Sequence, residues 1–177
     1  MSRGTMSTVF LTLGVAASAI LGQSKNGPPI PYIDKGACPF ECCTYRRWDV
    51  LKPTLVRSAM KDTAPVSFPL KPREKVLGMT GVVITTQPGI VRALKNTTLN
   101  NVLLKRGDEL FLLTNLGEGF SKIWFKGRIF EGDPNDESTY KTIREGKAIW
   151  WVKIKNRKGQ IGWSRQPENF GNVDQCG

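Results

Sequence analysis

Four cysteines are the residues with the clearest chemistry in this sequence. They stand as Cys38-x-x-x-Cys42-Cys43 and, far along the chain, as Cys176. An even number of thiols in an oxidising compartment predicts two disulfides. A bond between the neighbours Cys42 and Cys43 would be strained, so we expect Cys176 to pair with one of them and Cys38 with the other. A zinc site is the alternative, but zinc thiolates normally stand in two C-x-x-C pairs, a spacing that this sequence lacks.

The residues of hydrolytic chemistry are poorly represented. The chain has no histidine, so it lacks the usual general base of serine and cysteine hydrolases and the imidazole ligands of catalytic zinc. Its 15 acidic residues keep a carboxylate-based hydrolase open, but no pattern places two of them together. The acidic stretch 131–137 contains a proline and does not follow the calcium-loop pattern. We therefore expect no enzyme, no cofactor and no metal.

Aromatic residues offer binding chemistry instead. Trp150 and Trp151 are neighbours in an apolar stretch, so in a strand their side chains point to opposite faces. One is expected to lie in the core and the other to stay accessible, where an indole stacks on sugars or peptides at low entropy cost. The candidate ligand-binding residues are Trp150, Trp151, Lys153 and Trp124. The alternative is that both faces are covered, one of them by a second folded unit.

The first residues of the chain predict export. Arg3 is the only charge before an apolar stretch from Val9 to Leu21, which contains the cleavage-like sequence Ala17-Ser18-Ala19. We expect residues 1–19 to be a signal peptide, and cleavage after Gly22 is the alternative. A transmembrane anchor is disfavoured because a spanning helix needs roughly 20 apolar residues. The expected location is periplasmic or secreted, without a stable membrane span.

The charge of the chain indicates its partners. It carries 26 Lys and Arg against 15 Asp and Glu, a net +11, or +10 once residues 1–19 are removed. This excess favours anionic surfaces, and peptidoglycan or an anionic wall polymer are the expected partners. A protein partner is the alternative, and solubility alone would also explain the charge. Nucleic acid is not expected, since no dense basic run is present and an exported protein rarely meets it.

Short strands must position these residues. Apolar stretches rich in Val, Ile, Leu, Thr and aromatics alternate with turn signals, which is typical of an all-β sandwich or barrel. A hairpin is expected at Asn156-Arg157-Lys158-Gly159, because glycine tolerates a positive φ. The expected strands are 55–57, 66–68, 75–85, 90–94, 109–114, 121–130, 149–155 and 160–164.

A faint repeat suggests two similar units. The stretch Leu70-Lys71-Pro72-Arg73-Glu74-Lys75-Val76 returns 34 positions later as Leu104-Lys105-Arg106-Gly107-Asp108-Glu109-Leu110. In both, a basic, turn-forming and acidic group precedes an apolar strand, although chance similarity is the alternative. The expected organisation is a Pro/Gly-rich leader with the cysteine cluster at 20–47, a first unit at 48–88, and a second unit at 89–177 with an inserted polar loop at 131–147.

The closing stretch resembles a known family. Trp150-Trp151-Val152-Lys153-Ile154-Lys155, the hairpin turn and Gln160-Ile161-Gly162-Trp163 are similar to the last hairpin of bacterial Src-homology-3-like domains. The repeat 104–110 resembles the preceding strand of that family, and 70–76 resembles a first copy with Arg73 where the family prefers glycine. The resemblance covers about 48–165 with two copies or 90–165 with one. Residues 36–48 and the insertion lie outside the pattern.

This resemblance implies one or two small β-barrels that bind rather than catalyse. The predicted function is a non-catalytic exported module that recognises cell-wall peptide or glycan. A structural module that packs on a protein partner is the second hypothesis, and a carboxylate-based hydrolase is the third. The resemblance also predicts that Trp163 packs in its own barrel, because Gly162 lets the chain approach the facing strand.

Overall fold

The chain is all-β, as predicted. The computed structural model describes residues 27–176, so the expected signal peptide lies outside the described part. Within that range the strands are accompanied by one short 3-10 helix, η1 (Pro167–Asn169). Residues 27–176 contain no helix with the length and apolar character needed to cross a membrane.

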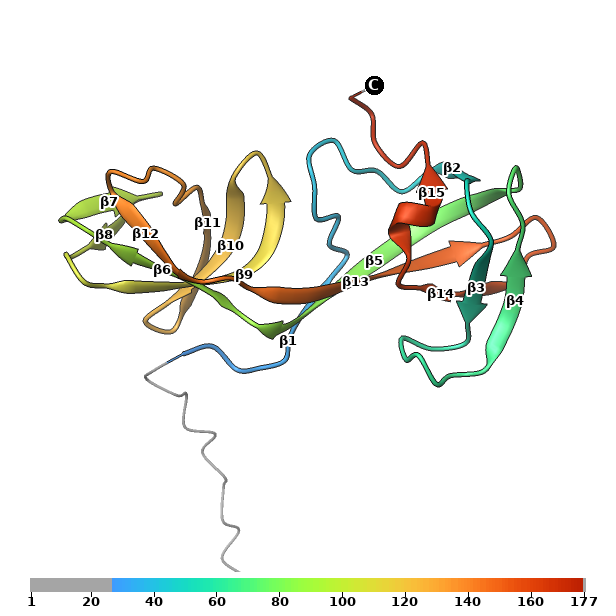
Figure 1. Ribbon diagram of the computed structural model, residues 1–177, viewed down its shortest axis with the longest axis horizontal. Helices are drawn as coiled ribbons and strands as arrows, with labels where there is room; N and C mark the ends of the chain where they lie inside the picture. Colours follow the sequence, from blue (N-terminus) through green and yellow to red (C-terminus); the bar gives the residue numbers. More distant parts are fainter. Residues whose placement is uncertain (1–26, 177) are drawn as a thin grey trace, which may run out of the picture.

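The larger sheet is curled into a half-barrel (Figure 1). Its strands follow the order β15-β2-β5-β13-β14-β3-β4, and β1 pairs with a further part of β5. The bounds are β1 (Tyr32–Lys35), β2 (Arg47–Val50), β3 (Thr54–Arg57), β4 (Val66–Leu70), β5 (Lys75–Gln87), β13 (Lys147–Lys155), β14 (Ile161–Ser164) and β15 (Phe170–Gly171).

The second sheet has the order β11-β10-β9-β6-β12, and a separate hairpin, β7-β8, lies beside it. The bounds are β6 (Gly89–Ala93), β7 (Thr97–Leu99), β8 (Val102–Leu104), β9 (Glu109–Gly117), β10 (Phe120–Phe125), β11 (Arg128–Gly132) and β12 (Tyr140–Arg144). The expected strand 121–130 is wrong as a single element, because Lys126 and Gly127 adopt positive φ and turn the chain back between β10 and β11.

Two long strands connect two lobes (Figure 1). The first lobe is formed by β2–β4, β13–β15 and the start of β5, and the second lobe by β6–β12. β5 and β13 pair antiparallel over nearly their whole lengths and continue into the second lobe through β6 and β12. Where they pass into it, Gly89 and Gly146 touch, and a Cβ on Gly146 would lie 3.0 Å from the Gly89 nitrogen.

The first core explains the alternating strand pattern of the first lobe. In β2 and β3 every second side chain is buried, and β4 follows the same alternation from Phe68 to Leu70. Gly78 faces the fully buried Trp48, and a Cβ there would lie 2.6 Å from the indole. The buried core consists of Trp48, Val50, Val56, Phe68, Leu70, Val76, Val152, Ile154 and Phe170.

The second lobe has a core of its own. It is built around Leu110 and Ile123, which are fully buried, with Val91, Ala93, Leu104, Phe125 and Tyr140 around them. Tyr140 belongs to β12, which pairs with β6. The stretch 131–147, expected to be a polar loop, therefore contributes a strand and a core residue to this lobe.

A buried ion pair joins the leader to the second lobe. The Asp34 carboxylate on β1 is 6% exposed and accepts a hydrogen bond of 2.9 Å from Lys122 Nζ on β10. Burial acts to lower the pKa of Lys122, but the hydrogen bond and charge of Asp34 outweigh it and raise that pKa. Thr85 Oγ1 of β5 also donates to the Leu113 carbonyl at 2.6 Å. The two lobes are thus held together by polar contacts as well as by continuous strands.

The structure divides the chain differently from the expected units 48–88 and 89–177. Strands β13 and β14 come last in the sequence, yet they pair with β5 and β3 of the first lobe. Val152 and Ile154 accordingly lie in the first core. The hairpin turn itself is where it was expected, with Gly159 at φ +82° and its N–H bonded to the Asn156 carbonyl.

The repeat corresponds to one turn built twice. Arg73 and Gly107 both adopt a positive φ, +73° and +91°. In each turn the following acid accepts a hydrogen bond from the N–H of the first lysine, Lys71 to Glu74 at 3.1 Å and Lys105 to Asp108 at 2.8 Å. The left-handed residue in each case donates its own N–H to a neighbouring strand end, at 2.8 Å.

Two disulfides close the first lobe, as predicted. The bonds are Cys38–Cys43 and Cys42–Cys176, which selects one of the two expected pairings. The chain end is also bound by an antiparallel bridge from Cys43 to Asp174. Arg46 donates to Asn172 Oδ1 at 2.6 Å and also contacts the Asp174 carbonyl. The second bond spans 134 positions, so it fixes the end of the chain to the segment before β2.

Candidate functional site

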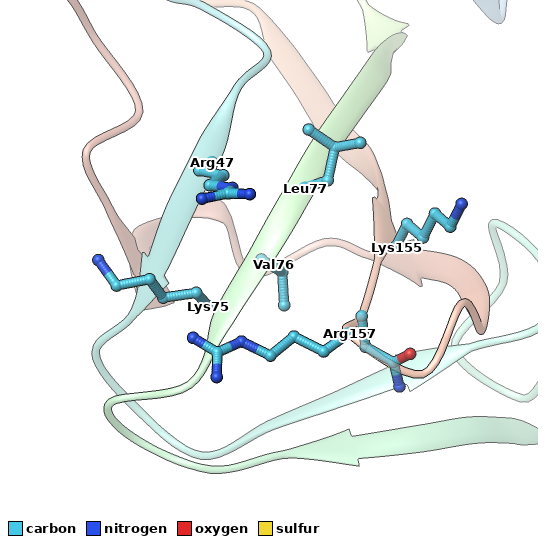
Figure 2. Close-up of a pocket in the computed structure, with 7 residues that line it drawn as sticks. Arg47, Lys75, Val76, Leu77, Lys155 and Arg157 are labelled. Carbon is cyan, nitrogen blue, oxygen red and sulfur yellow. The ribbon is translucent and has the colours of Figure 1, made fainter.

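A basic hollow of about 580 Å³ lies at the hairpin end of the first lobe. Figure 2 shows its cationic side chains arranged around the start of β5, with the Arg157 side chain extending across that strand toward Lys75. The lining residues come from β2, β5, β13 and the hairpin turn, and they are Arg47, Lys75, Val76, Leu77, Lys155, Asn156 and Arg157.

Strand register determines which cations meet. Arg47 and Lys155 are both paired with Leu77, one from each neighbouring strand. Directly opposed residues have Cβ atoms roughly 5 Å apart, so a cation lies on either side of the exposed Leu77. Lys75 lies two residues earlier on the same face of β5 and forms an ion pair of 2.9 Å with Asp49.

An adjoining hollow continues the positive surface. It shares Lys75, Asn156 and Arg157 with the first and adds further cations from the turn at 71–74 and from the hairpin. The basic end is the set of seven cations that line the two hollows: Arg47, Lys71, Arg73, Lys75, Lys155, Arg157 and Lys158. With Glu74 and Asp49 as the acids among them, seven positive and two negative charges leave +5, nearly half of the +11 of the chain.

Most of these cations have no acidic partner within residues 27–176. Of the seven, only Lys75 takes part in an ion pair in the described part of the chain. Unpaired like charges this close repel one another and raise the local potential. The arrangement stabilises the fold little by itself and suits the binding of a multiply charged anion.

The hairpin turn holds its two cations in place. Asn156 Oδ1 accepts hydrogen bonds from the N–H groups of Lys158 and Gln160, both at 3.0 Å. The Asn156 amide donates to Gln160 Oε1 at 2.8 Å. These hydrogen bonds order the turn, so the backbone that carries the Arg157 and Lys158 side chains is held in one conformation.

A third hollow, of about 520 Å³, lies on the outer face of β3, β14 and β13. Four of its nine lining residues are aromatic or aliphatic, and the other five are polar or charged. Trp163 is half-buried, and Lys153 Nζ lies 5.7 Å from the centre of its ring, within cation–π range. Arg165 and Asp62 form an ion pair of 2.7 Å at the rim. This aromatic hollow is lined by Pro53, Leu55, Arg57, Asp62, Trp151, Trp163, Ser164, Arg165 and Gln166.

The structure separates the four candidate binding residues. Trp151 and Lys153 lie on the outer face of β13. Trp151 lines the aromatic hollow but is only 4% exposed, so the outer-face tryptophan is buried rather than accessible as expected. Trp150 points to the first core, where the edge of Phe40 packs on it at 5.6 Å and its Nε1 donates to Tyr45 Oη at 3.3 Å. Trp124 lies in the second lobe, 8% exposed and packed against a neighbouring phenylalanine.

The cysteine segment, rather than a second unit, covers Trp150. Phe40 and Tyr45 both belong to the stretch 36–48, for which the sequence offered no role. Tyr45 also hydrogen-bonds to the Ala37 carbonyl. Burial raises the pKa of its phenol to about 12. A Cβ on Gly81 would overlap the Tyr45 hydroxyl and the Trp150 indole, so this close packing requires glycine.

Trp163 is the aromatic residue that sequence reasoning misplaced. It was expected in the barrel core, but Gly162 and Ser164 are the buried residues of β14. A Cβ on Gly162 would lie 2.6 Å from the Arg57 carbonyl, so the close approach predicted at this glycine is present. Trp163 then faces outward opposite Lys153. Counting back from the hairpin turn would have shown this register.

Comparisons with known protein families, curated proteins and solved structures gave no match. The likeness to bacterial Src-homology-3-like domains therefore stays a prediction. The basic end and the aromatic hollow are the surfaces from which we infer function.

Other reactive groups lie elsewhere on the surface. Glu41 faces Glu118, whose charge raises the pKa of Glu41, but both are exposed and line neither hollow. Ser-x-x-Lys spacings occur at 58–61 and 138–141, which the sequence reading overlooked, and their serines and lysines are all exposed. The described residues hold one metal-like cluster, which consists of Glu41 with the disulfide-bonded Cys42 and Cys176.

Proposed function

We propose that this protein is a non-catalytic binding module that acts outside the cytoplasm and recognises an anionic polymer, such as a charged polymer of a cell wall. The observation that carries the proposal is the basic end, where seven cations converge and six of them have no ion pair among residues 27–176. A polymer with regularly spaced negative groups fits such an open surface better than a small anion does.

Electrostatics set the strength and rate of this contact. Opposite unit charges about 4 Å apart attract by about 1 kcal/mol in water. Several such contacts add up on one polymer chain, and the field of the basic end also speeds the encounter. Affinity should therefore fall steeply with salt, since the Debye length shrinks from about 10 Å at 0.1 M to about 3 Å at 1 M.

The export proposal is supported by the cysteines. Both disulfides are formed, and disulfides persist mainly in oxidising compartments. Intact-mass analysis of the protein recovered outside the cytoplasm should give an N-terminus between residues 20 and 24. Retention of Met1 would contradict this part of the proposal.

The polymer proposal is tested with a charge-neutralised variant and a matched control. Lys155→Gln/Arg157→Gln removes two cations from the basic end, and Lys141→Gln/Arg128→Gln removes the same charge from exposed strands of the second lobe. Binding to poly-L-glutamate and polygalacturonate is measured by titration calorimetry at rising salt. Two lost contacts correspond to about 2 kcal/mol, or roughly thirtyfold in affinity.

We expect this loss in the first variant and less than a threefold loss in the control. Equal losses in both variants would mean that only net charge matters and that no site exists. No binding of either polyanion to the wild type at low salt would overturn the proposal.

A further inference from the structure

The basic end and the aromatic hollow are linked by one strand face. Lys155, Lys153 and Trp151 are alternate residues of β13, so their side chains leave the same face of the sheet. Lys155 lines the basic hollow, and Trp151 lines the aromatic hollow. At about 3.3 Å per residue, the two are about 13 Å apart along the strand.

Lys153 occupies the middle of this path. It is paired with Trp163 of β14, and Trp163 is paired in turn with Arg57 of β3. A row of Lys153, Trp163 and Arg57 therefore crosses three strands, with the indole between two cations. The neighbouring outward residues are apolar and exposed to solvent, Ile161 at 44% and Leu55 at 52%.

This pattern selects a ligand with two properties. The cations require negative groups, and the indole face between them requires a flat or ring-shaped apolar surface within a few ångströms of those groups. Polyphosphates and acidic polypeptides supply the charges without the ring. An acidic sugar supplies both, because the C–H face of its ring packs on an indole while its carboxylate or phosphate meets a cation.

We propose that the polymer is an acidic polysaccharide that lies along β13, with its negative groups at Lys155 and Lys153 and one sugar ring packed against Trp163. This inference rests on the proposed function and names its substrate class. Single-stranded nucleic acid also combines rings with charges. Its binding sites use several aromatic residues for successive bases, however, whereas this path offers the half-buried Trp163 beside a Trp151 that is only 4% exposed.

Wild-type selectivity gives the first test. Oligogalacturonates of increasing length, poly-L-glutamate oligomers with the same number of carboxylates, and oligothymidylates are titrated at one salt concentration. We expect the sugar oligomers to bind about tenfold more tightly than the peptides once they are long enough to span about 13 Å. Equal affinity for sugar and peptide oligomers, or tighter binding of oligothymidylate, would overturn the inference.

Trp163→Ala gives the second test, with Phe120→Ala as a control at a 48% exposed aromatic residue of the second lobe. The loss of an aromatic contact corresponds to about tenfold in affinity. We expect Trp163→Ala to lower oligogalacturonate affinity by this factor and to leave poly-L-glutamate affinity within twofold. Trp163→Phe should restore part of the sugar affinity.

The outcomes separate this inference from the proposed function. If Trp163→Ala changes neither affinity, or lowers both equally in a folded protein, the sugar ring does not pack here, while binding of polyanions by the basic end still stands. If no polyanion binds, both proposals fail. Should Trp163→Ala not fold, the wild-type selectivity alone decides.

Discussion

The turn at Lys71–Glu74 and the turn at Lys105–Asp108 share a backbone and differ in charge. Both have a left-handed third residue and an acid that accepts the N–H of the first lysine. In the second lobe the left-handed residue is Gly107, and Lys126 pairs with Asp108 at 3.1 Å. In the first lobe the left-handed residue is Arg73, which is one of the seven cations of the basic end.

The second lobe pairs part of its charge. Arg92, Lys122 and Lys126 each contact an acid, whereas Lys105, Arg106 and Lys141 take part in no ion pair among residues 27–176. Although burial acts to raise the pKa of Asp108, the hydrogen bonds from Lys105 and Lys126 lower it. In the second lobe this turn has an ion pair between Asp108 and Lys126, whereas in the first lobe neither Arg73 nor Glu74 takes part in one among residues 27–176.

The largest expected effect concerns the Cys42–Cys176 disulfide, which fixes the chain end to the segment before β2. In the chain-entropy model, the Cys42–Cys176 bond, which spans 134 positions, stabilises by about 5 kcal/mol, against about 2 kcal/mol for Cys38–Cys43. Urea unfolding of Cys42→Ser/Cys176→Ser and Cys38→Ser/Cys43→Ser should show this order. A larger loss of stability for Cys38→Ser/Cys43→Ser would mean that closing the short loop stabilises the first lobe more than fixing the chain end does.

Sequence reasoning predicted local structure better than the assignment of strands to lobes. The all-β class, the hairpin turn and the repeated turn follow from residue types over a few positions. The pairing of Cys176 with Cys42 or Cys43 followed instead from the small number of cysteines and the strain of a bond between neighbours. The pairing of β13 with β5 joins segments about 70 positions apart, and no local pattern encodes it. The resemblance to a contiguous barrel therefore led to the wrong grouping of the last hairpin.

The candidate site was only partly visible in the sequence. Trp150 and Trp151 were correctly expected on opposite faces of one strand, because alternation in a strand is local. The basic end was not predicted, since Arg47, Lys75 and Arg157 meet only after three separate segments pair. Trp163 was predictable from the hairpin register, but its neighbour Gly162 was read as evidence for a core position.

The second prediction contrasts two tryptophans of the first lobe. Trp48 is fully buried, so Trp48→Ala should cost about 3–5 kcal/mol. Trp163 lies half-buried on the outer face, and Trp163→Ala should cost about 1 kcal/mol, well below a core deletion. Thermal melting of both variants checks this. Equal costs would place Trp163 in the core, as the family resemblance first implied.

The third prediction tests whether the cations of the second lobe are structural. Lys122→Met leaves the buried Asp34 carboxylate without its partner and should cost about 2 kcal/mol, below the 3–5 kcal/mol of a fully buried pair because Lys122 is 27% exposed. Arg157→Met in the basic end should change stability by less than about 0.5 kcal/mol. Urea unfolding of both variants measures the difference. A larger loss of stability for Arg157→Met than for Lys122→Met would mean that Arg157 is structural and Lys122 is not.

The smallest expected effect comes from exchanging the residues at positive φ in the two turns, Arg73 and Gly107. A residue other than glycine at positive φ costs about 1–2 kcal/mol, and part of this is offset because glycine loses more backbone freedom on folding. Arg73→Gly should therefore stabilise the protein by about 0.5–1 kcal/mol while it lowers the affinity for polygalacturonate several-fold. Gly107→Arg should destabilise it by about 1 kcal/mol without a comparable gain in affinity, because Asp108 lies beside it. Urea unfolding and calorimetric titration of both variants give the four values. If Arg73→Gly binds as tightly as the wild type, Arg73 belongs to the fold rather than to the site, and the two turns differ only by chance.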